Sequence, residues 1–434
     1  MNNESRITDI VDFNPPRKLK KGQIAPFIDM AALPTNERDI VEITEKAFTG
    51  GAKFRNGDTL FARITPCLEN GKTGKVSNLS DEVIGHGSTE FIVMTAKDSE
   101  IDEDYVYYLA RLPEFRKFAQ MRMTGTSGRQ RVSWQDLAEF TFAFPEPEKR
   151  KAAGVFLKTI DDKIQLNTQT NQTLEQIAQA IYKSWFVDYE PTRAKAAVLA
   201  AGGSKAEAES AAMRAISGKT AAALATLAQN HPARYQQLAD LAAAFPAALV
   251  PTDDFGEIPE GWEVKRIEDV IQKIPVGKKY SQKTVTEKGK VPVLDQGKSG
   301  LIGYHNDKAG VQASLENPVI VFANHTCYMR LITYDFSAIQ NVFAFRGKNC
   351  NVLWLYLATL GKQQFVDYKG HFPDFLIKDI VVPPDELTEI FGRQVKHLFY
   401  KVAINDKENK TLSETRDAIL PKLLSGDFSD AKTS

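Results

Sequence analysis

Two stretches of the chain carry apolar residues in alternating steps of four and three, and a gapless alignment places Ile160 of the first opposite Leu398 of the second. The first stripe contains Ile160, Ile164, Asn167, Asn171, Leu174, Ala178, Ile181 and Trp185, and the second contains Leu398, Val402, Asn405, Asn409, Leu412, Arg416, Ile419 and Leu423. An average step of about 3.5 residues predicts a coiled-coil helix, because it keeps one narrow stripe facing a partner helix. Asparagines at the same two positions of each stripe indicate a fixed register, since a polar seam residue trades stability for specificity.

The repeat continues upstream of each helix as short strand-like segments. Residues 57–67 (GDTLFARITPC) match 317–327 (NPVIVFANHTC), and residues 88–95 (STEFIVMT) match 339–346 (IQNVFAFR). Fainter matches join residues 7–11 to 267–271 and residues 26–29 to 292–295. Each half therefore predicts short strands with Gly and Asn turns, one helix, a closing strand and then the long helix.

This pattern predicts an α+β fold with two α+β modules in tandem. The modules are separated by two long helices, which we expect to form an antiparallel coiled coil with pseudo-two-fold symmetry. The alternative is that each amphipathic helix packs only on its own module. The expected domains are a first module (1–145), a first long helix (146–189), an Ala-rich helical connector (190–250), a second module (251–383), a second long helix (384–426) and a tail (427–434).

Composition excludes several classes of protein. Lys and Arg together number 55 and so do Asp and Glu, so the formal net charge is zero. Any nucleic-acid site must therefore be a local basic patch, because the chain as a whole does not attract a polyanion. The sequence has no apolar run of the length that a membrane span requires, and its N-terminus is unlike a secretory signal. Three cysteines without a CxxC pair do not form a disulfide scaffold. We expect a cytoplasmic protein.

The sequence contains no complete catalytic or cofactor motif. Residues 71–73 and 218–220 (both GKT) lack the earlier glycine of a phosphate-binding loop. Residues 13–16 (FNPP) are similar to the core of an amino-methyltransferase motif, but Arg17 follows where an aromatic residue should stack on the base. The six histidines show no metal-ligand spacing. We therefore expect no catalytic residue, no metal site and no cofactor in this chain.

Basic segments in both modules are the stronger functional signal. Residues 124–131 (TGTSGRQR) combine glycines, hydroxyl groups, a glutamine and two arginines, a set that contacts phosphates and reads base edges. Residues 271–298 carry seven lysines against two acidic residues. Either segment taken alone is equally well explained as a solvated basic face. One in each copy of a repeat favours DNA, because a duplex offers two half-sites to a two-fold protein.

The DNA-binding candidates come from these segments and from neighbouring turns. In the first module they are Arg63, Lys72, Lys75, Arg122, Thr126, Ser127, Arg129, Gln130 and Arg131. In the second module they are Lys278, Lys279, Tyr280, Lys283, Lys298, Asn324, His325, Lys369 and His371.

The chain resembles the specificity subunit of type I restriction–modification enzymes. The resemblance covers nearly the whole chain and is carried by the duplicated order of module and long helix, by residues 128–164 (GRQRVSWQDLAEFTFAFPEPEKRKAAGVFLKTIDDKI), by 171–189 (NQTLEQIAQAIYKSWFVDY) with its echo at 409–428, and by 258–264 (IPEGWEV). Two departures from the family pattern weaken the transfer of residue roles from one half of the chain to the other. The second module has only residues 366–374 (VDYKGHFPD) in place of TGTSGRQR, and the first module lacks the GW entry phrase.

The resemblance implies a sequence-specific DNA-binding subunit without catalysis of its own. Each module would read one half of a bipartite target in double-stranded DNA, and the helices would set the gap. Two methyltransferase (M) subunits would dock on the chain and methylate adenine with S-adenosylmethionine. Motor–nuclease (R) subunits would join and use ATP and Mg²⁺.

Apolar residues near the end of the first long helix allow two interpretations. Ile177, Tyr182, Trp185 and Phe186 form either a docking face for partner subunits or a packing face against the sister helix. Two other classes of function also stay open. One is a coiled-coil adaptor that binds protein rather than DNA, and the other is a complete enzyme with unrecognised motifs.

Overall fold

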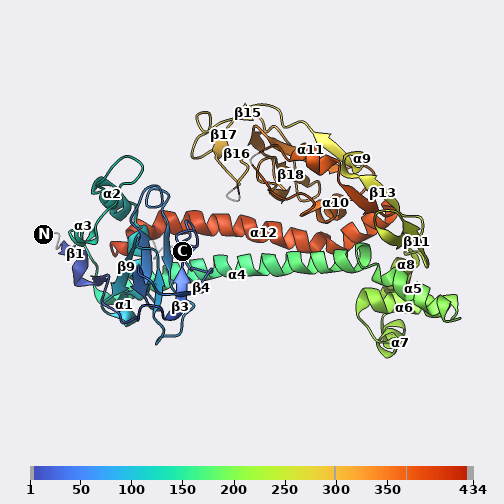
Figure 1. Cartoon of the computed structure of the whole chain (residues 1–434), viewed down its shortest axis with the longest axis horizontal. Helices are drawn as coiled ribbons and strands as arrows, with labels where there is room; N and C mark the ends of the chain where they lie inside the picture. The colour runs from blue at the N-terminus through green and yellow to red at the C-terminus, as the bar shows by residue number, and fades with distance from the viewer. Residues whose placement is uncertain (1–3, 298–299, 368, 428–434) are drawn as a thin grey trace. The chain divides into compact units, whose positions relative to one another are not determined.

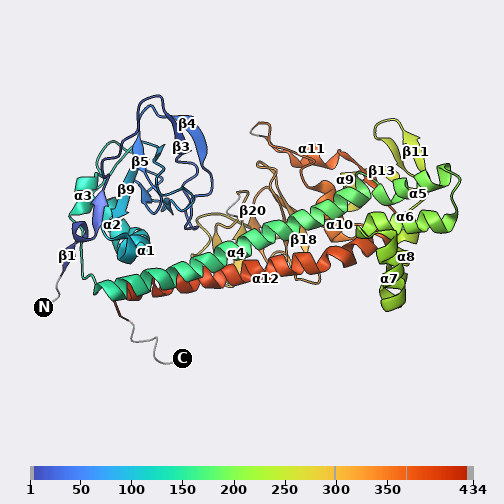
Figure 2. The same ribbon diagram turned by 90° about the horizontal axis from the view of Figure 1, so that it is seen from below.

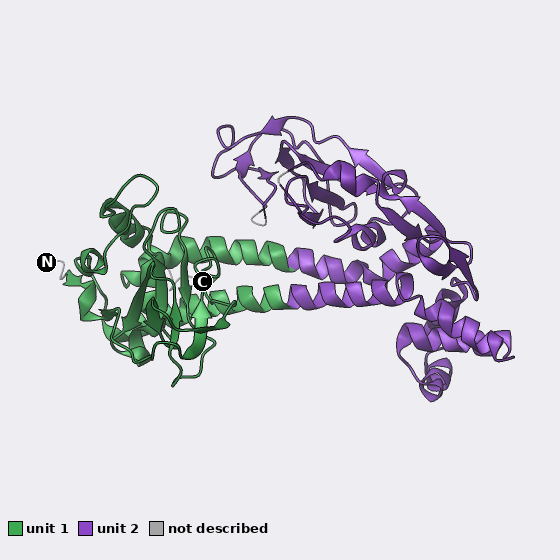
Figure 3. Ribbon diagram, in the orientation of Figure 1, with its two compact units in different colours: residues 1–169, 405–434 green, residues 170–404 purple. Residues whose placement is uncertain are grey.

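The computed structural model describes residues 4–297, 300–367 and 369–427 (Figure 1), so the expected tail lies outside the described residues apart from Asp427. The chain divides into two compact units, residues 1–169 with 405–434 and residues 170–404 (Figure 3). Each unit contains one α+β module and a part of both long helices, α4 (Pro147–Phe186) and α12 (Asp385–Leu424). Within the described residues, no helix is both long enough and apolar enough to cross a membrane.

The module of the first unit is built on two four-stranded sheets. One sheet has the order β2-β9-β6-β7 and the other the order β4-β3-β8-β5. The strands of the first sheet are β2 (Val11–Phe13), β9 (Phe91–Ala96), β6 (Thr59–Ala62) and β7 (Thr73–Lys75). The strands of the second are β4 (Thr44–Ala47), β3 (Ile24–Ile28), β8 (Gly85–Gly87) and β5 (Ala52–Phe54). A short pair, β1 (Ser5–Arg6) with β10 (Thr141–Phe142), closes the module beside η1 (Ile7–Asp9). The helices are α1 (Ser99–Arg111), α2 (Pro113–Met121) and α3 (Trp134–Ala138).

The module of the second unit also has two four-stranded sheets, β14-β21-β18-β19 and β17-β16-β20-β15. The first has the same order as β2-β9-β6-β7, whereas the second differs at one edge, because β15 precedes β16 in the chain and pairs parallel with β20, while β5 follows β4 and pairs antiparallel with β8. The first contains β14 (Ile271–Ile274), β21 (Val342–Gly347), β18 (Val319–Ala323) and β19 (Met329–Ile332). The second contains β17 (Gly303–His305), β16 (Val291–Leu294), β20 (Ser337–Ile339) and β15 (Lys279–Tyr280). Two strand pairs complete it, β13 (Glu263–Arg266) with β22 (Asp379–Val382) and β11 (Leu249–Thr252) with β12 (Gly256–Pro259). Its helices are α9 (Ile267–Val270), α10 (Val352–Thr359) and α11 (Phe372–Leu376).

Matched segments occupy matched places in the two modules, which confirms the duplication. The paired segments at 57–67 and 317–327 contain β6 and β18, and those at 88–95 and 339–346 form most of β9 and β21. The faint match between residues 7–11 and 267–271 is also confirmed, because the first residue of each segment bonds to the end of its own module. Ile7 N donates to Phe140 O and Ile267 N donates to Lys378 O, both at 2.9 Å. The predicted fold class, two α+β modules in a pseudo-two-fold repeat, is therefore confirmed.

A glycine at the same repeat position lets each long helix approach its module closely. A Cβ atom on Gly154 would lie 3.0 Å from Tyr105 N in α1, and one on Gly392 would collide with the Asn351 side chain that caps α10. Larger side chains would separate helix from module at both places. Glycine therefore occurs at this position in both long helices because each helix packs against its module in the same way.

The Ala-rich connector forms four helices, α5 (Glu190–Ala200), α6 (Lys205–Ser217), α7 (Ala221–Asn230) and α8 (Pro232–Ala243). Met213, Leu224 and neighbouring alanines form a small core of their own. Lys195 is buried and donates to Glu209 at 3.0 Å and to Phe245 O at 2.8 Å. The connector is thus a packed helical insertion rather than an extended linker.

Within each unit, the segments of α4 and α12 lie side by side and run antiparallel (Figures 1 and 2). In the first unit Asn167 Nδ2 donates to Glu408 and to Asn409 Oδ1, both at 2.9 Å, and in the second Asn171 Nδ2 donates to Val402 O at 3.4 Å. All the predicted stripe positions are buried or half-buried. The alternation of four and three thus predicted the face along which the helices pair.

Replacing two seam asparagines tests whether they specify register. We expect Asn167→Leu combined with Asn405→Leu to raise the melting temperature or to change helix pairing, because leucine packs in an apolar seam in more than one register. Thermal unfolding and sedimentation of the purified chain measure both effects. Gln172→Leu, at an exposed position of α4, is the matched control. Unchanged melting together with unchanged assembly in the double variant would contradict the seam role.

Candidate nucleic-acid interface

The basic loop 124–131 of the first module is an exposed turn on a rigid base. Thr124 and Arg131 pair across the loop, and Arg129 N donates to Thr126 O at 3.0 Å. Gly125 and Gly128 have φ of 127° and 78°, values that glycine adopts without the strain of a side chain. Thr65 N donates to Gln130 O at 3.0 Å and thereby holds the base of the loop next to β6. The loop therefore presents its tip, with Thr126, Ser127 and Arg129 exposed, to solvent.

The two arginines of this loop have different roles. Arg131 Nη2 lies 2.8 Å from Glu90 Oε1, and Arg131 Nε lies 2.9 Å from both carboxylate oxygens. These hydrogen bonds to Glu90 raise the pKa of Arg131 above its usual value. The Arg129 side chain makes no hydrogen bond or ion pair with the described part of the chain. Arg131 therefore anchors the loop, and Arg129 is the cation available to a ligand.

Three other candidates of the first module already have partners within the chain. Lys75 is only 5% exposed and pairs with Glu103 at 2.8 Å and with Asp104. Lys72 Nζ donates to Met30 O at 2.7 Å. The Arg122 guanidinium lies 3.5 Å from the centre of the Phe118 ring. The expectation that Lys75 contacts DNA is corrected, because a buried lysine that neutralises two carboxylates cannot reach a phosphate.

The basic segment at the start of the second module is arranged around a buried stack. Tyr280 is buried with its ring parallel to that of His305, with 4.1 Å between ring centroids, and its hydroxyl donates to Asp307 at 3.1 Å. Burial lowers the pKa of His305. Lys278 Nζ pairs with Asp307 at 3.0 Å. Tyr280 is therefore corrected from a DNA-binding candidate to a structural residue. Lys279 and Lys283 are exposed, whereas Lys298 lies outside the described residues.

The structure brings the remaining candidates of the second module together in one cluster. His371 N donates to Asn324 O at 2.9 Å, Phe372 N donates to Asn324 Oδ1 at 2.8 Å, and His325 Nδ1 lies 2.9 Å from Lys369 O. Asn324 and His371 are buried, so the structure corrects both from DNA contacts to residues that shape the loop. His325 is half-buried, and Lys369 is exposed but paired with Asp374 at 3.2 Å.

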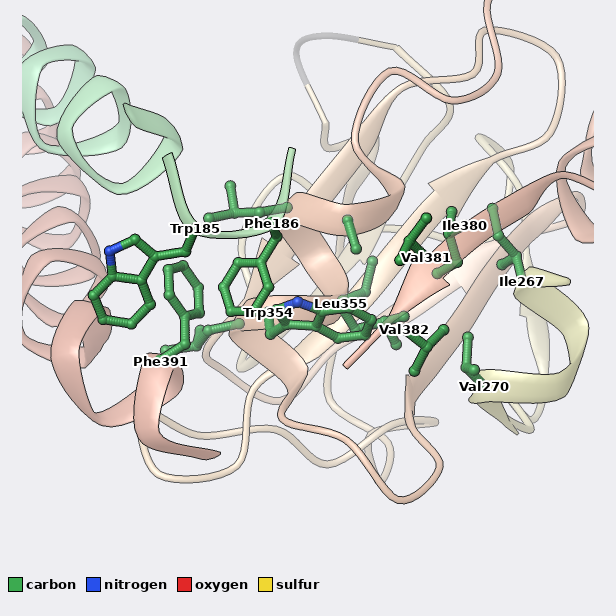
Figure 4. Close-up of a cluster of buried hydrophobic side chains, with 14 of the residues drawn as sticks. Trp185, Phe186, Ile267, Val270, Trp354, Leu355, Ile380, Val381, Val382 and Phe391 are labelled. Carbon is green, nitrogen blue, oxygen red and sulfur yellow. The ribbon is translucent and has the colours of Figure 1, made fainter. Parts of the chain in front are cut away.

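The predicted docking residues mostly belong to the core of the second unit. Trp185 and Phe186 are buried, and they pack against Phe391 with 5.7 and 5.2 Å between ring centroids (Figure 4). Tyr182 packs edge-on against Phe391 at 6.1 Å, and burial raises the pKa of its hydroxyl. Of the two interpretations, packing against the sister helix therefore describes Tyr182, Trp185 and Phe186. Ile177 remains exposed at 43%.

Sequence reasoning missed a pocket of about 460 Å³ in the first module, although it named one of the lining residues, Arg63, as a DNA-binding candidate. The pocket is formed by Asn14, Pro16, Arg17, Lys53, Arg63 and Thr89, among others. Arg17 pairs with buried Asp58 at 2.7 Å, and burial raises the pKa of Asp58 while Arg17 opposes that rise. The signal in the sequence is the FNPP segment, which matches a catalytic motif only in part and contributes the pocket wall instead.

These features, a duplicated α+β module, paired long helices and exposed basic loops, define a class of DNA-recognition proteins. The model of the type I restriction modification DNA specificity domain matches residues 2–176 and 259–380, and the chain belongs to this family.

Similar proteins match three quarters or more of the chain. The chain is 32% identical to the type I restriction enzyme HindI specificity subunit of Haemophilus influenzae, over 93% of this chain and 94% of that protein. It is 24% identical to the MjaIX specificity subunit of Methanocaldococcus jannaschii, over 76% and 70% of the two chains. The crystal structure of the type I restriction-modification S subunit from M. genitalium matches with a TM-score of 0.46 and 13% identity, over 97% of this chain and 96% of that one.

Proposed function

We propose that each module reads one half of a bipartite target in double-stranded DNA. The duplication carries this proposal: the two modules share the strand order of one sheet, yet the exposed loop 124–131 of the first has no counterpart in the second. A constant scaffold with different loops suits the reading of two different half-sites. In this proposal the paired long helices set the gap between the half-sites.

The proposal assigns the chemistry to partner subunits. Two methyltransferase subunits bind S-adenosylmethionine and methylate adenine, and motor–nuclease subunits use ATP and Mg²⁺. The chain itself holds no cofactor and works in the cytoplasm, where it has access to DNA. For docking, the proposal replaces the buried aromatic residues with exposed positions on α4, namely Val155, Phe156 and Ile177.

Methylome sequencing tests the proposal, with Arg129→Ala as the decisive variant. We expect cells that express the chain with its methyltransferase to contain a methylated adenine motif split by a fixed gap, and we expect none without the chain. If Arg129 contacts a base, Arg129→Ala relaxes one half of the motif and weakens binding by about 1–3 kcal/mol.

Lys348→Ala, at an exposed position of the second module outside its basic segment, is the matched control and should leave both halves of the motif unchanged. Equal loss of methylation at every sequence in Arg129→Ala would identify a phosphate contact instead. The absence of any motif, with an active methyltransferase, would favour the protein-binding adaptor.

A further inference from the structure

The pocket of the first module has an excess of positive charge. Its described lining residues include three cations, Arg17, Lys53 and Arg63, and no carboxylate. Arg17 is neutralised by Asp58, to which it donates at 2.9 Å, and it also donates to Lys53 O at 2.9 Å. Lys53 Nζ donates to Arg17 O at 2.9 Å. One guanidinium, that of Arg63, is left without a counterion in the described part of the chain.

Arg63 combines a fixed backbone with an unsatisfied side chain. Its N donates to Glu90 O and its O accepts from Val132 N, both at 3.0 Å. Its Nε is buried and has no acceptor among the described residues. A buried donor without a partner destabilises the folded chain, and an incoming acceptor removes that cost. The site is therefore prepared for a ligand that accepts hydrogen bonds and carries negative charge.

The pocket is adjacent to the exposed basic loop. Residues 63–65 support the base of that loop, because Val132 N bonds to Arg63 and Gln130 N donates to Thr65 Oγ1 at 3.1 Å. Glu90 contributes its backbone O to Arg63 and its carboxylate to Arg131. A ligand at Arg63 thus lies at the foot of the loop whose tip carries Arg129. The ring carbons of Pro15 and Pro16 provide an apolar wall beside the cation.

We propose that this pocket binds one phosphate of the DNA backbone, with Arg63 as its cation and the attached sugar against the two prolines. Guanidinium groups suit phosphate because their planar donors match its oxygens. A phosphate held here fixes the register in which the loop 124–131 meets base edges, since backbone contacts position a protein and base contacts specify the sequence. The proposal rests on the proposed function.

The phosphate-pocket proposal is tested by measuring DNA affinity at several salt concentrations. The protein is the full-length chain, alone and co-expressed with methyltransferase subunits. The duplexes are the motif found by methylome sequencing and an unrelated sequence of equal length. We expect Arg63→Ala to weaken binding to both duplexes by the same factor, about fivefold near physiological salt, and to lower the slope of log K against log salt by about 0.9. Arg63→Lys should retain the slope. Arg55→Ala, which removes an exposed cation from the same module, should also leave the slope unchanged.

Each contrary outcome has a distinct meaning. An unchanged slope in Arg63→Ala, with normal binding by the wild type, would overturn the pocket proposal alone. Weakened binding to the motif duplex only would make Arg63 a base reader and overturn it as well. If inorganic phosphate raised the melting temperature of the wild type but not of Arg63→Ala, while their DNA slopes coincided, the pocket would be a site for free anions and the proposal would be wrong. Absence of salt-dependent binding by the wild type in both forms would overturn the proposed function, and the pocket proposal with it.

Discussion

Arg416→Met is expected to lower the free energy of unfolding of the first unit by about 3–5 kcal/mol. Arg416 on α12 and Asp161 on α4 are 3% and 5% exposed, and Arg416 Nη1 lies 2.6 Å from Asp161 Oδ1. The Tyr108 hydroxyl of α1 donates to the other oxygen of Asp161 at 2.6 Å. Removal of the guanidinium leaves a buried carboxylate with its charge uncompensated, which is among the largest costs a single substitution can impose.

The repeat provides a test within the same molecule. In the alignment of the two long helices, Asp161 corresponds to Phe399 and Arg416 corresponds to Ala178, so the second unit builds the same place in the seam from apolar residues. The triple variant Arg416→Met, Asp161→Leu, Tyr108→Phe should therefore recover most of the lost stability, because no buried polar group is left unpaired. Denaturant unfolding of the three forms measures this. Equal destabilisation of the single and triple variants would mean that packing rather than charge dominates.

The long helices could be predicted from the sequence because they pack along one narrow stripe. The coiled-coil period is a local property, and both helices contact a partner of the same kind along most of their length. The charged pair in that seam could not be predicted in the same way. Asp161 follows the stripe residue Ile160, and its importance depends on Tyr108, which comes from a distant part of the chain.

The candidate DNA-binding residues could be predicted less well from the sequence than the long helices could. Residue type identified the basic segments, but accessibility depends on partners that composition does not reveal. Lys75 is neutralised by carboxylates that enter through α1, and Tyr280 is covered by His305 from a later strand, β17. Among the loop residues, Arg129 stays a candidate because residues 124–129 form a turn with little around it. In this chain, a basic residue in a glycine-rich loop is therefore more readily predicted to be exposed than a lysine in a strand.

The aromatic residues at the end of α4 are where a heptad pattern is least informative. The pattern places Trp185 on the helix–helix seam, but it does not reveal that a third element covers the neighbouring Phe186. In the structure Phe186 packs against Trp354 and Phe391, with 6.2 and 5.2 Å between ring centroids (Figure 4). It also packs against Trp262, at 5.7 Å between ring centroids. The end of the first long helix is therefore part of the hydrophobic core of the second unit.

Phe186→Ala is accordingly expected to lower the free energy of unfolding of the second unit by about 3–5 kcal/mol, the usual cost of truncating a buried aromatic side chain. Ile177→Ala is the matched control on the same helix. Because Ile177 is 43% exposed, its truncation should change stability by no more than about 0.5 kcal/mol. Thermal unfolding of the purified chains separates the two variants.

Copurification with methyltransferase subunits provides the second readout and separates packing from docking. Under the packing interpretation, Phe186→Ala loses complex only to the extent that the chain unfolds, and lowering the temperature restores assembly. Ile177→Ala should do the reverse, with wild-type melting and a weaker complex, because an exposed apolar side chain contributes its burial only when a partner covers it. A Phe186→Ala chain that melts like the wild type yet fails to assemble would return this residue to the docking surface.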